Sequence, residues 1–226
     1  MRKQLIAVIP VSLLLISGCA YFNTFYNAKQ AYKKGQEEMA EQQGRQGNTA
    51  AGKEKYNRAI EKCQKVIDLY PTSRYVDDAL LLMGKSYYYT KQYLPSLRRL
   101  GHLIRLYPQS TLVGEAALFR ARNYLALEQL DSAQITLDRL QSQVVGTELG
   151  AEALLIRAEL AERTQDFQGA VGFYEQALDN GIRQNRYVTY LAVAAIHDTL
   201  GQYEKSAIIF DLGTGSLVNR NRVHLK

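Results

Sequence analysis

The chain has 226 residues, a formal net charge of +6, 16 tyrosines, no tryptophan and two cysteines. The positive charge is modest, and no basic stripe with interleaved aromatic residues runs along the chain, so a nucleic-acid-binding protein is not indicated. The length allows one or two domains of ordinary size.

The first residues carry a targeting pattern. Arg2 and Lys3 precede the apolar run Leu5–Ile16, which is too short for a helix that crosses a membrane. Ile16-Ser17-Gly18 then places small residues directly before Cys19. The pattern predicts a secretory signal peptide over residues 1–18, and its Ile-Ser-Gly-Cys ending resembles a bacterial lipobox.

The lipobox resemblance implies cleavage before Cys19 and acylation of its thiol and new amino group. Each buried CH₂ of an acyl chain contributes about 0.8 kcal/mol, so more than one chain would hold the protein on a membrane surface without a spanning helix. Ala20 follows the cysteine, at the position where an aspartate would be expected in a lipoprotein that is not sorted to the outer membrane. In lacking this aspartate, the chain resembles lipoproteins that are sorted to the outer membrane and face the periplasm. Cys63 is then the remaining thiol, and its apolar spacing predicts a small buried side chain.

The first predicted helix after the anchor is Asn27–Lys34, which is expected to end near Gly35. Residues 36–55 form an inserted loop in our prediction, either throughout or after extra helical turns through Glu37-Glu38-Met39, because residues 42–49 are polar, contain glycine and lack an apolar period. The loop is either a tolerated insertion or a segment that binds a partner.

The next stretch has the pattern of a helical hairpin. A first helix is indicated by apolar and small residues at i, i+3, i+4 and i+7, namely Leu80, Met83, Gly84 and Tyr87. A second helix is indicated in the same way by Tyr93, Leu97, Leu100, Ile104 and Tyr107. Thr90–Gln92 is a short turn between them, so the helices must fold back antiparallel, and Pro108 ends the second one.

This hairpin repeats with a step of 37 residues. One step on, the equivalent positions are occupied by Ala121, Tyr124, Leu130, Ala133, Leu137 and Leu140, and two steps on by Ala158, Ala161, Phe167, Ala170, Tyr174 and Ala177. One step back gives Tyr56, Ala59, Cys63 and Val66, and a last step of 36 gives Ala194, Tyr203, Ser206 and Phe210. Such a period is typical of stacked helical hairpins.

These residues resemble the tetratricopeptide repeat over roughly residues 24–212, with a repeat about three residues longer than usual. We therefore expect an all-α protein, a right-handed α-solenoid of about five hairpins over residues 19–212. Ser73, Ser110 and Thr147 are predicted N-caps. The Gly-rich run after Phe210 is expected to interrupt the last helix, no capping helix is predicted, and residues 213–226 form a basic tail of uncertain structure.

The tetratricopeptide resemblance implies a concave groove that binds an extended peptide or a helix. Five positions of each first helix face this groove in such families. In this chain they are Asp78, Leu81, Lys85, Tyr88 and Tyr89, then Glu115, Leu118, Arg122, Leu125 and Ala126, and then Glu152, Leu155, Glu159, Glu162 and Arg163.

No enzyme is predicted. His102, His197 and His224 occupy unrelated repeat positions, and no Cys-x-x-Cys or His-x-x-x-His spacing is present, so neither catalytic residues, a metal site nor a cofactor is indicated.

Two Leu-Tyr-Pro runs, Leu69-Tyr70-Pro71 and Leu106-Tyr107-Pro108, together with the lipobox and Tyr26-Asn27-Ala28, resemble the lipoprotein subunit of the β-barrel assembly (Bam) machinery. That resemblance implies a lipid-anchored scaffold that holds a barrel-insertion protein at the outer membrane. A second hypothesis is a soluble periplasmic adaptor for cell division or peptidoglycan synthesis, similar to the TolA-binding coordinator. A third, an envelope hydrolase, would need a carboxylate pair beside His102 or His197.

Overall fold

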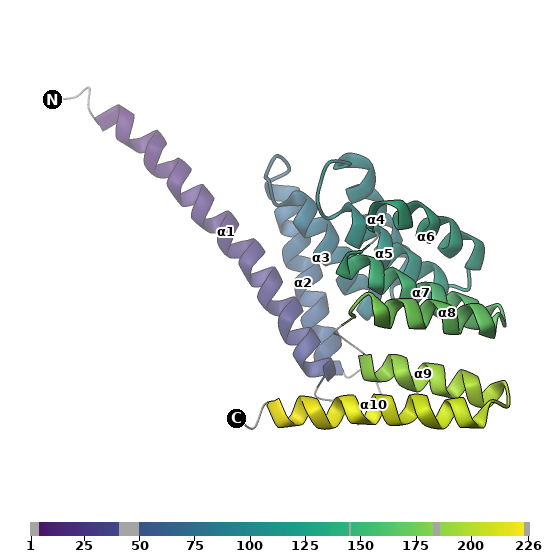
Figure 1. Ribbon diagram of the computed structural model, residues 1–226. Helices are drawn as coiled ribbons and strands as arrows, with labels where there is room; N and C mark the ends of the chain where they lie inside the picture. The colour runs from purple at the N-terminus through teal and green to yellow at the C-terminus, as the bar shows by residue number, and fades with distance from the viewer. Residues whose placement is uncertain (1–4, 41–49, 145, 183–185, 224–226) are drawn as a thin grey trace. The chain divides into compact units, whose positions relative to one another are not determined.

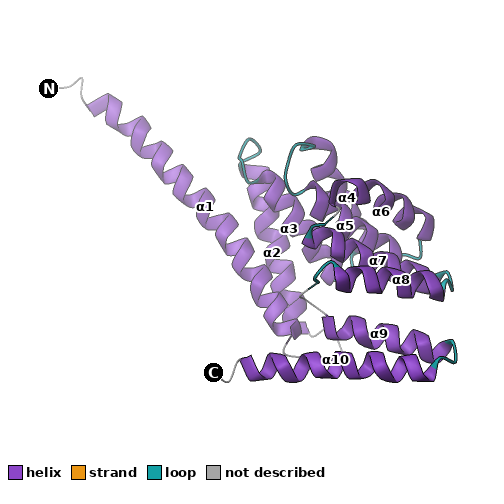
Figure 2. Cartoon of the chain, viewed as in Figure 1, coloured by secondary structure: helices purple, strands orange, loops and turns teal. Residues whose placement is uncertain are grey.

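A computed structural model describes residues 5–40, 50–144, 146–182 and 186–223, in which every regular element is an α-helix (Figures 1 and 2). The helices are α1 (Leu5–Ala40), α2 (Ala50–Leu69), α3 (Val76–Tyr89), α4 (Tyr93–Leu106), α5 (Val113–Ala126), α6 (Leu130–Val144), α7 (Glu148–Arg163), α8 (Phe167–Asp179), α9 (Arg186–Thr199) and α10 (Tyr203–Val223). The all-α class is confirmed. The chain divides within α5 into two compact units, residues 1–123 and 124–226.

In each unit, positions that are one repeat apart have the same environment. The small residues at the closest helix contacts are completely buried, as Ser96, Ala133 and Ala170 all have 0% exposure. The large residues beside them are also buried, at 0% for Leu100 and Leu137 and 9% for Tyr174. The predicted repeat of helical hairpins is therefore confirmed, and Cys63 is buried at the equivalent position, as expected.

The α3–α4 hairpin shows why small residues recur. A Cβ atom added to Gly84 would lie 2.5 Å from Cδ2 of Leu100, so a larger residue would force the Leu100 side chain or the helices to shift. The Ser96 hydroxyl donates to the Gly84 carbonyl oxygen at 2.7 Å, and Asn123 Nδ2 donates to Ser96 Oγ at 2.9 Å. These buried hydrogen bonds connect α3, α4 and α5.

The tight turns inside the hairpins place a residue in the left-handed region. Lys91, Glu128 and Gln165 have φ values of 62°, 57° and 62°, and Gly201 holds the corresponding place in the last hairpin at 71°. Of these four turns, only the last uses glycine, the residue best suited to this conformation, because side chains with a Cβ atom are strained there.

We therefore expect Gln165→Gly to raise the free energy of unfolding by about 1 kcal/mol, since it removes the strain of a left-handed non-glycine residue. Urea denaturation followed by circular dichroism measures the change. Glu175→Gly is the control, because Glu175 is exposed inside α8 and the same type of change should cost about 1 kcal/mol there. Loss of stability in both variants would contradict the assignment of strain to the turn.

The predicted loop over residues 36–55 is shorter than expected: the alternative with helical turns through Met39 is confirmed, and the loop's predicted end at residue 55 is wrong. α1 continues past Gly35 to Ala40, and α2 already begins at Ala50, while residues 41–49 lie outside the described part of the chain. Both extensions carry ion pairs at i, i+4 spacing, Lys33–Glu37 at 3.6 Å and Glu54–Arg58 at 2.7 Å. Gly35 does not end its helix; a Cβ atom there would lie 3.0 Å from the Tyr56 ring, so the glycine permits close packing of α1 on α2.

The last helix also differs from expectation, because α10 continues without interruption through the Gly-rich run to Val223. Gly213 is buried, and a Cβ atom there would lie 2.9 Å from Cβ of Tyr190 on α9. This glycine therefore serves close contact between α9 and α10, which a sequence pattern of helix-breaking residues does not reveal.

The predicted N-caps have mixed outcomes. Thr147 caps α7, because its hydroxyl accepts from the Gly150 N–H at 3.1 Å. Ser73 and Ser110 do not cap helices; each accepts from the N–H two residues later, at 3.2 Å, in the turn before the helix. Ser110 also donates to Oδ2 of Asp77 at 2.7 Å, which ties this turn to α3. Within the ranges that the structure describes, no helix has the length and apolar character needed to cross a membrane.

Candidate functional site

The first unit holds a cation among aromatic rings at the predicted groove position of α3. The Lys85 ammonium lies 2.6 Å from Oε1 of Glu115 on α5, and 5.2 Å from the ring centroids of both Tyr32 and Phe119. Its side chain is 18% exposed and that of Glu115 is 35% exposed. The ion pair is thus partly removed from water, where it is stronger than a surface pair.

Aromatic rings from four helices surround this ion pair. Tyr89 stacks on Tyr56 at 5.1 Å between centroids and lies 6.1 Å from Tyr32. Tyr88 contacts the Phe119 ring edge-to-face at 5.6 Å. We call Tyr32, Lys85, Tyr88, Tyr89, Glu115 and Phe119 the Lys85 cluster. Tyr32 and Phe119 are buried, at 6% and 4% exposure, so they contact Lys85 from the core side. The arrangement suits binding because the half-buried Tyr88 and Tyr89 supply apolar area and the ammonium has three donors, of which Glu115 accepts one.

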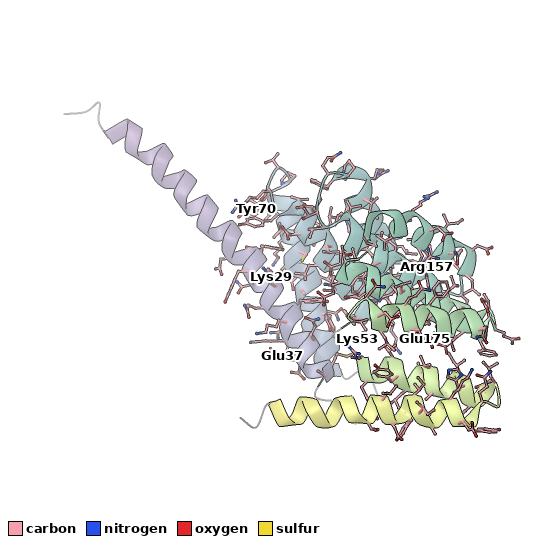
Figure 3. All side chains as sticks on the ribbon, in the orientation of Figure 1. Lys29, Glu37, Lys53, Tyr70, Arg157 and Glu175 are labelled. Carbon is pink, nitrogen blue, oxygen red and sulfur yellow. The ribbon has the colours of Figure 1, made fainter. Side chains whose placement is uncertain are left out.

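The remaining predicted groove residues of this unit are not equally available. Leu81 and Leu118 are buried, at 7% and 1% exposure, so the prediction that they line an open groove is wrong. Both positions are apolar and pack into the core. Asp78 is half-buried; burial raises the pKa of its carboxyl group, neighbouring Asp77 adds to the rise and Lys29 of α1 opposes it (Figure 3). Arg122 is also half-buried, and its guanidinium lies 5.0 Å from the Phe119 ring centroid.

The predicted groove residues of the second unit are largely engaged with one another. Arg163 donates to Oε1 of Glu159 at 2.9 Å and also pairs with Glu128. Glu162 accepts a hydrogen bond from the Tyr174 hydroxyl, which joins α7 to α8. Leu155 packs against the apolar cluster of this unit, and Glu152 is half-buried with interactions of its own. These polar contacts therefore stabilise the hairpin. Leu125, which the resemblance also placed in the groove, is buried at 2% exposure.

Sequence reasoning missed the two rings nearest to Lys85. Phe119 lies four residues after Glu115, one turn along the same face of α5. Tyr32 lies four residues after Ala28, the spacing that separates Gly84 from Tyr88, so an alignment of Ala28 with Gly84 would have placed Tyr32 on the groove side. The irregular first repeat concealed this relation.

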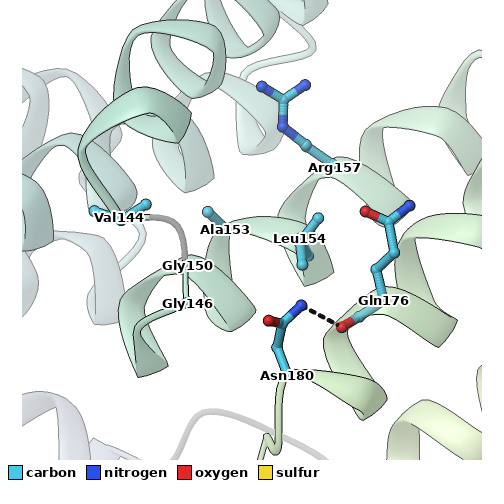
Figure 4. A pocket seen from close by; sticks show the side chains of 8 residues that line it. All are labelled: Val144, Gly146, Gly150, Ala153, Leu154, Arg157, Gln176 and Asn180. Carbon is cyan, nitrogen blue, oxygen red and sulfur yellow. Dashed lines mark hydrogen bonds between the residues drawn. The ribbon is translucent and has the colours of Figure 1, made fainter.

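In the second unit, a hollow of about 110 Å³ lies beside α7 and α8. Figure 4 shows the Arg157 guanidinium pointing away from Gln176 and Asn180 on the other wall. Arg157 instead donates to Oδ1 of Asp138 at 2.8 Å, with its own side chain 8% exposed and that of Asp138 55% exposed. The buried arginine is therefore committed to an ion pair within the unit.

This pair predicts a pH dependence of stability. The hydrogen bond from Arg157 lowers the pKa of the Asp138 carboxyl below its ordinary value. The contribution is thus present above the unfolded-state pKa of an aspartate, about 4, and is lost as the pH falls through the lower folded-state value. Between pH 6 and pH 2.5, Asp138→Asn should lose less unfolding free energy than the unchanged protein. Asp179→Asn, at an exposed carboxyl group, should follow the unchanged protein, and equal slopes for all three would refute the assignment.

The hydrolase hypothesis gains no support from the histidine environment. His197 is buried, and its Nδ1 lies 2.9 Å from Oε1 of Gln202. Among the described residues, no three side chains of the histidine, cysteine, aspartate or glutamate type come together as a metal ion would require. Burial also raises the pKa of the Cys63 thiol, which keeps it protonated and unreactive.

A sequence-family model, YfiO, described as outer membrane lipoprotein, matches residues 26–145, which is more than half of the chain. No curated protein matches the sequence.

Several solved structures share the fold. The crystal structure of MamA has a TM-score of 0.60 at 16% identity, over 75% of this chain and 93% of that one. MamA 41-end from Desulfovibrio magneticus RS-1 has a TM-score of 0.58 at 11% identity, over 84% and 94% of the two chains. The Rap conjugation gene regulator of plasmid pLS20, solved in complex with the Phr* peptide, has a TM-score of 0.63 at 14% identity, over 76% of this chain and 49% of that one. At these identities the likeness concerns the fold, which agrees with the predicted tetratricopeptide-like solenoid.

Proposed function

This chain belongs to the YfiO family of outer membrane lipoproteins, and we propose that it is a non-enzymatic scaffold that binds an envelope protein during the assembly of outer membrane β-barrel proteins. Lipid on Cys19 anchors it to the outer membrane, after removal of residues 1–18, and the helical hairpins face the periplasm. The observation that carries the binding role is the Lys85 cluster, in which an ammonium group held by Glu115 lies in the same cluster as the half-buried rings of Tyr88 and Tyr89.

The cluster suits a polypeptide partner. A segment lying over Tyr88 and Tyr89 would bury apolar side chains against the rings, while its carbonyl or carboxylate oxygens could accept from Lys85. The Rap regulator, which has a similar fold, was solved with a bound peptide, and this supports a peptide or helix as the ligand of the hairpin surface. Glu115 holds the ammonium in place before the partner arrives.

Lys85→Met tests the site, because it removes the ammonium and keeps most of the apolar stem. We expect about tenfold weaker recovery of the partner in an affinity pull-down from detergent-solubilised membranes, as is typical of a central binding residue. Lys53→Met is the matched control, since Lys53 is exposed on α2 (Figure 3). Equal recovery with both variants would remove the Lys85 cluster from the binding surface.

Cys19→Ser tests the anchor separately. Incorporation of radiolabelled palmitate and retention in the outer membrane fraction should both be lost, because the serine lacks the thiol that receives the lipid. A chain that never takes up palmitate would instead fit the soluble periplasmic adaptor. The two experiments are independent, so failure of one leaves the other interpretable.

A further inference from the structure

The α9–α10 hairpin exposes apolar residues whose equivalents in the α7–α8 hairpin are buried. α9 and α10 border a groove of about 450 Å³, on which Tyr203 is 70% exposed and Phe210 is 47% exposed. Its lining residues are Leu191, Ala194, Ala195, Asp198, Tyr203, Ser206, Ala207, Phe210 and Asp211. Exposed aromatic residues gathered beside alanines form a surface that gains free energy when it is covered.

The repeat identifies the covered counterpart of this surface. Val171 and Tyr174 stand 36 residues before the exposed Ala207 and Phe210, and Ala158 stands 36 residues before Ala194, which is buried at 5%. The three earlier residues, Val171, Tyr174 and Ala158, are buried at 5%, 9% and 0%. They form one apolar cluster with Val193 and Ile196, which belong to α9. In the α7–α8 hairpin, therefore, an amphipathic helix occupies the place that is open between α9 and α10.

We propose that the α9–α10 groove binds an amphipathic α-helix of another protein, with branched apolar side chains at the i, i+3 spacing of Val193 and Ile196. This second binding surface goes beyond the proposed role of the Lys85 cluster and does not depend on it. The chain's own α9 has that face buried against α7 and α8, so it is not free to fill the groove of a second copy.

The carboxylates of the groove favour a positive charge on the partner helix. In the α7–α8 hairpin the corresponding acid, Glu162, accepts from the Tyr174 hydroxyl. Phe210 replaces this tyrosine in the last hairpin and has no hydroxyl to offer Asp198. Asp198 and Asp211 therefore favour a lysine or arginine on the partner helix. The same two charges disfavour adsorption of the groove to an anionic lipid surface.

The probe is a peptide of residues 186–199, whose sequence fills the equivalent groove, labelled with fluorescein. A hydrocarbon cross-link between positions 188 and 195, both exposed on α9, keeps it helical, because short helices are marginal in water. Fluorescence anisotropy with the full chain should give saturable binding. Ala207→Arg, at an exposed position in the groove, should weaken binding at least about tenfold. Ile208→Arg is the matched control, as its side chain is 61% exposed outside the groove, and it should bind like the unchanged protein.

A peptide with Val193→Asp should not bind. This control distinguishes recognition of the apolar face from non-specific binding. The proposal is overturned if the cross-linked peptide shows no saturable binding, or if Ala207→Arg and Ile208→Arg bind it equally. Sedimentation of the chain without peptide tests whether a second copy of the chain occupies the groove. Self-association that Ala207→Arg abolishes would make a second copy the occupant and would overturn the assignment to a different protein.

Discussion

Leu100→Ala is expected to lower the free energy of unfolding by about 2–5 kcal/mol. Leu100 is completely buried where α3, α4 and α5 meet, in a cluster with Leu80, Leu103 and Phe119. Removing its isobutyl group forfeits the transfer free energy and leaves a cavity that the rigid helices only partly close. Urea denaturation followed by circular dichroism measures the loss.

Leu94→Ala is the matched control, because Leu94 lies in the same helix and is 58% exposed. Its replacement should change stability by less than about 0.5 kcal/mol, as for most surface substitutions. If the two leucines gave equal losses, helix propensity and not hairpin packing would dominate the stability of α4, and the equivalence of Leu100 with Leu137 and Tyr174 would carry no energetic meaning.

Gly84→Ala is expected to destabilise the protein by about 2 kcal/mol, although alanine favours helices by about 1 kcal/mol over glycine. The added Cβ atom would lie 2.5 Å from Cδ2 of Leu100, whose side chain is completely buried among its neighbours. Gly101→Ala in α4 is the control, since a Cβ atom there meets nothing within 4 Å, and it should stabilise by about 1 kcal/mol.

The same pair of residues offers a sharper measurement. In a Leu100→Ala background the collision is gone, so Gly84→Ala should change sign and stabilise the protein, by both helix propensity and partial filling of the cavity. A double-mutant cycle measures this coupling directly. Additive effects would show that Gly84 and Leu100 do not share a contact that limits the approach of α3 and α4.

Much of the fold could be predicted because the tetratricopeptide-like hairpin is a local structure. Residues 76–106 need only helical spacing, a three-residue turn and a small residue at the crossing, and all three are visible in the sequence. The first repeat is harder to predict from the sequence, because its polar residues are typical of a loop. In the structure they are helical, with ion pairs at i, i+4 spacing and with Met39 packed against Tyr32, Tyr56 and Ala59. The sequence predicts that the glycines at positions 35 and 213 end or interrupt helices, whereas in the structure they allow close contact between neighbouring helices.

The candidate site could be predicted from the sequence less well than the fold. Lys85, Tyr88 and Tyr89 were identified from repeat position, but the same rule included Leu81 and Leu118, which the core buries. Tyr32 and Phe119 reach Lys85 from α1 and α5, and no spacing within one repeat reports a contact between different repeats. Such contacts depend on the distance between hairpins, which packed side chains set.

Residue order alone established the period of the chain, the all-α class and the positions where helices touch, since each depends on neighbours within one hairpin. The choice of which exposed side chains form a binding surface was made in three dimensions. Lys85 is held by a carboxylate thirty residues away, and Phe210 is exposed while Tyr174 is covered, although the two occupy the same place in the repeat. The physical reason is that burial is a property of the whole packed structure, whereas helical periodicity belongs to the segment.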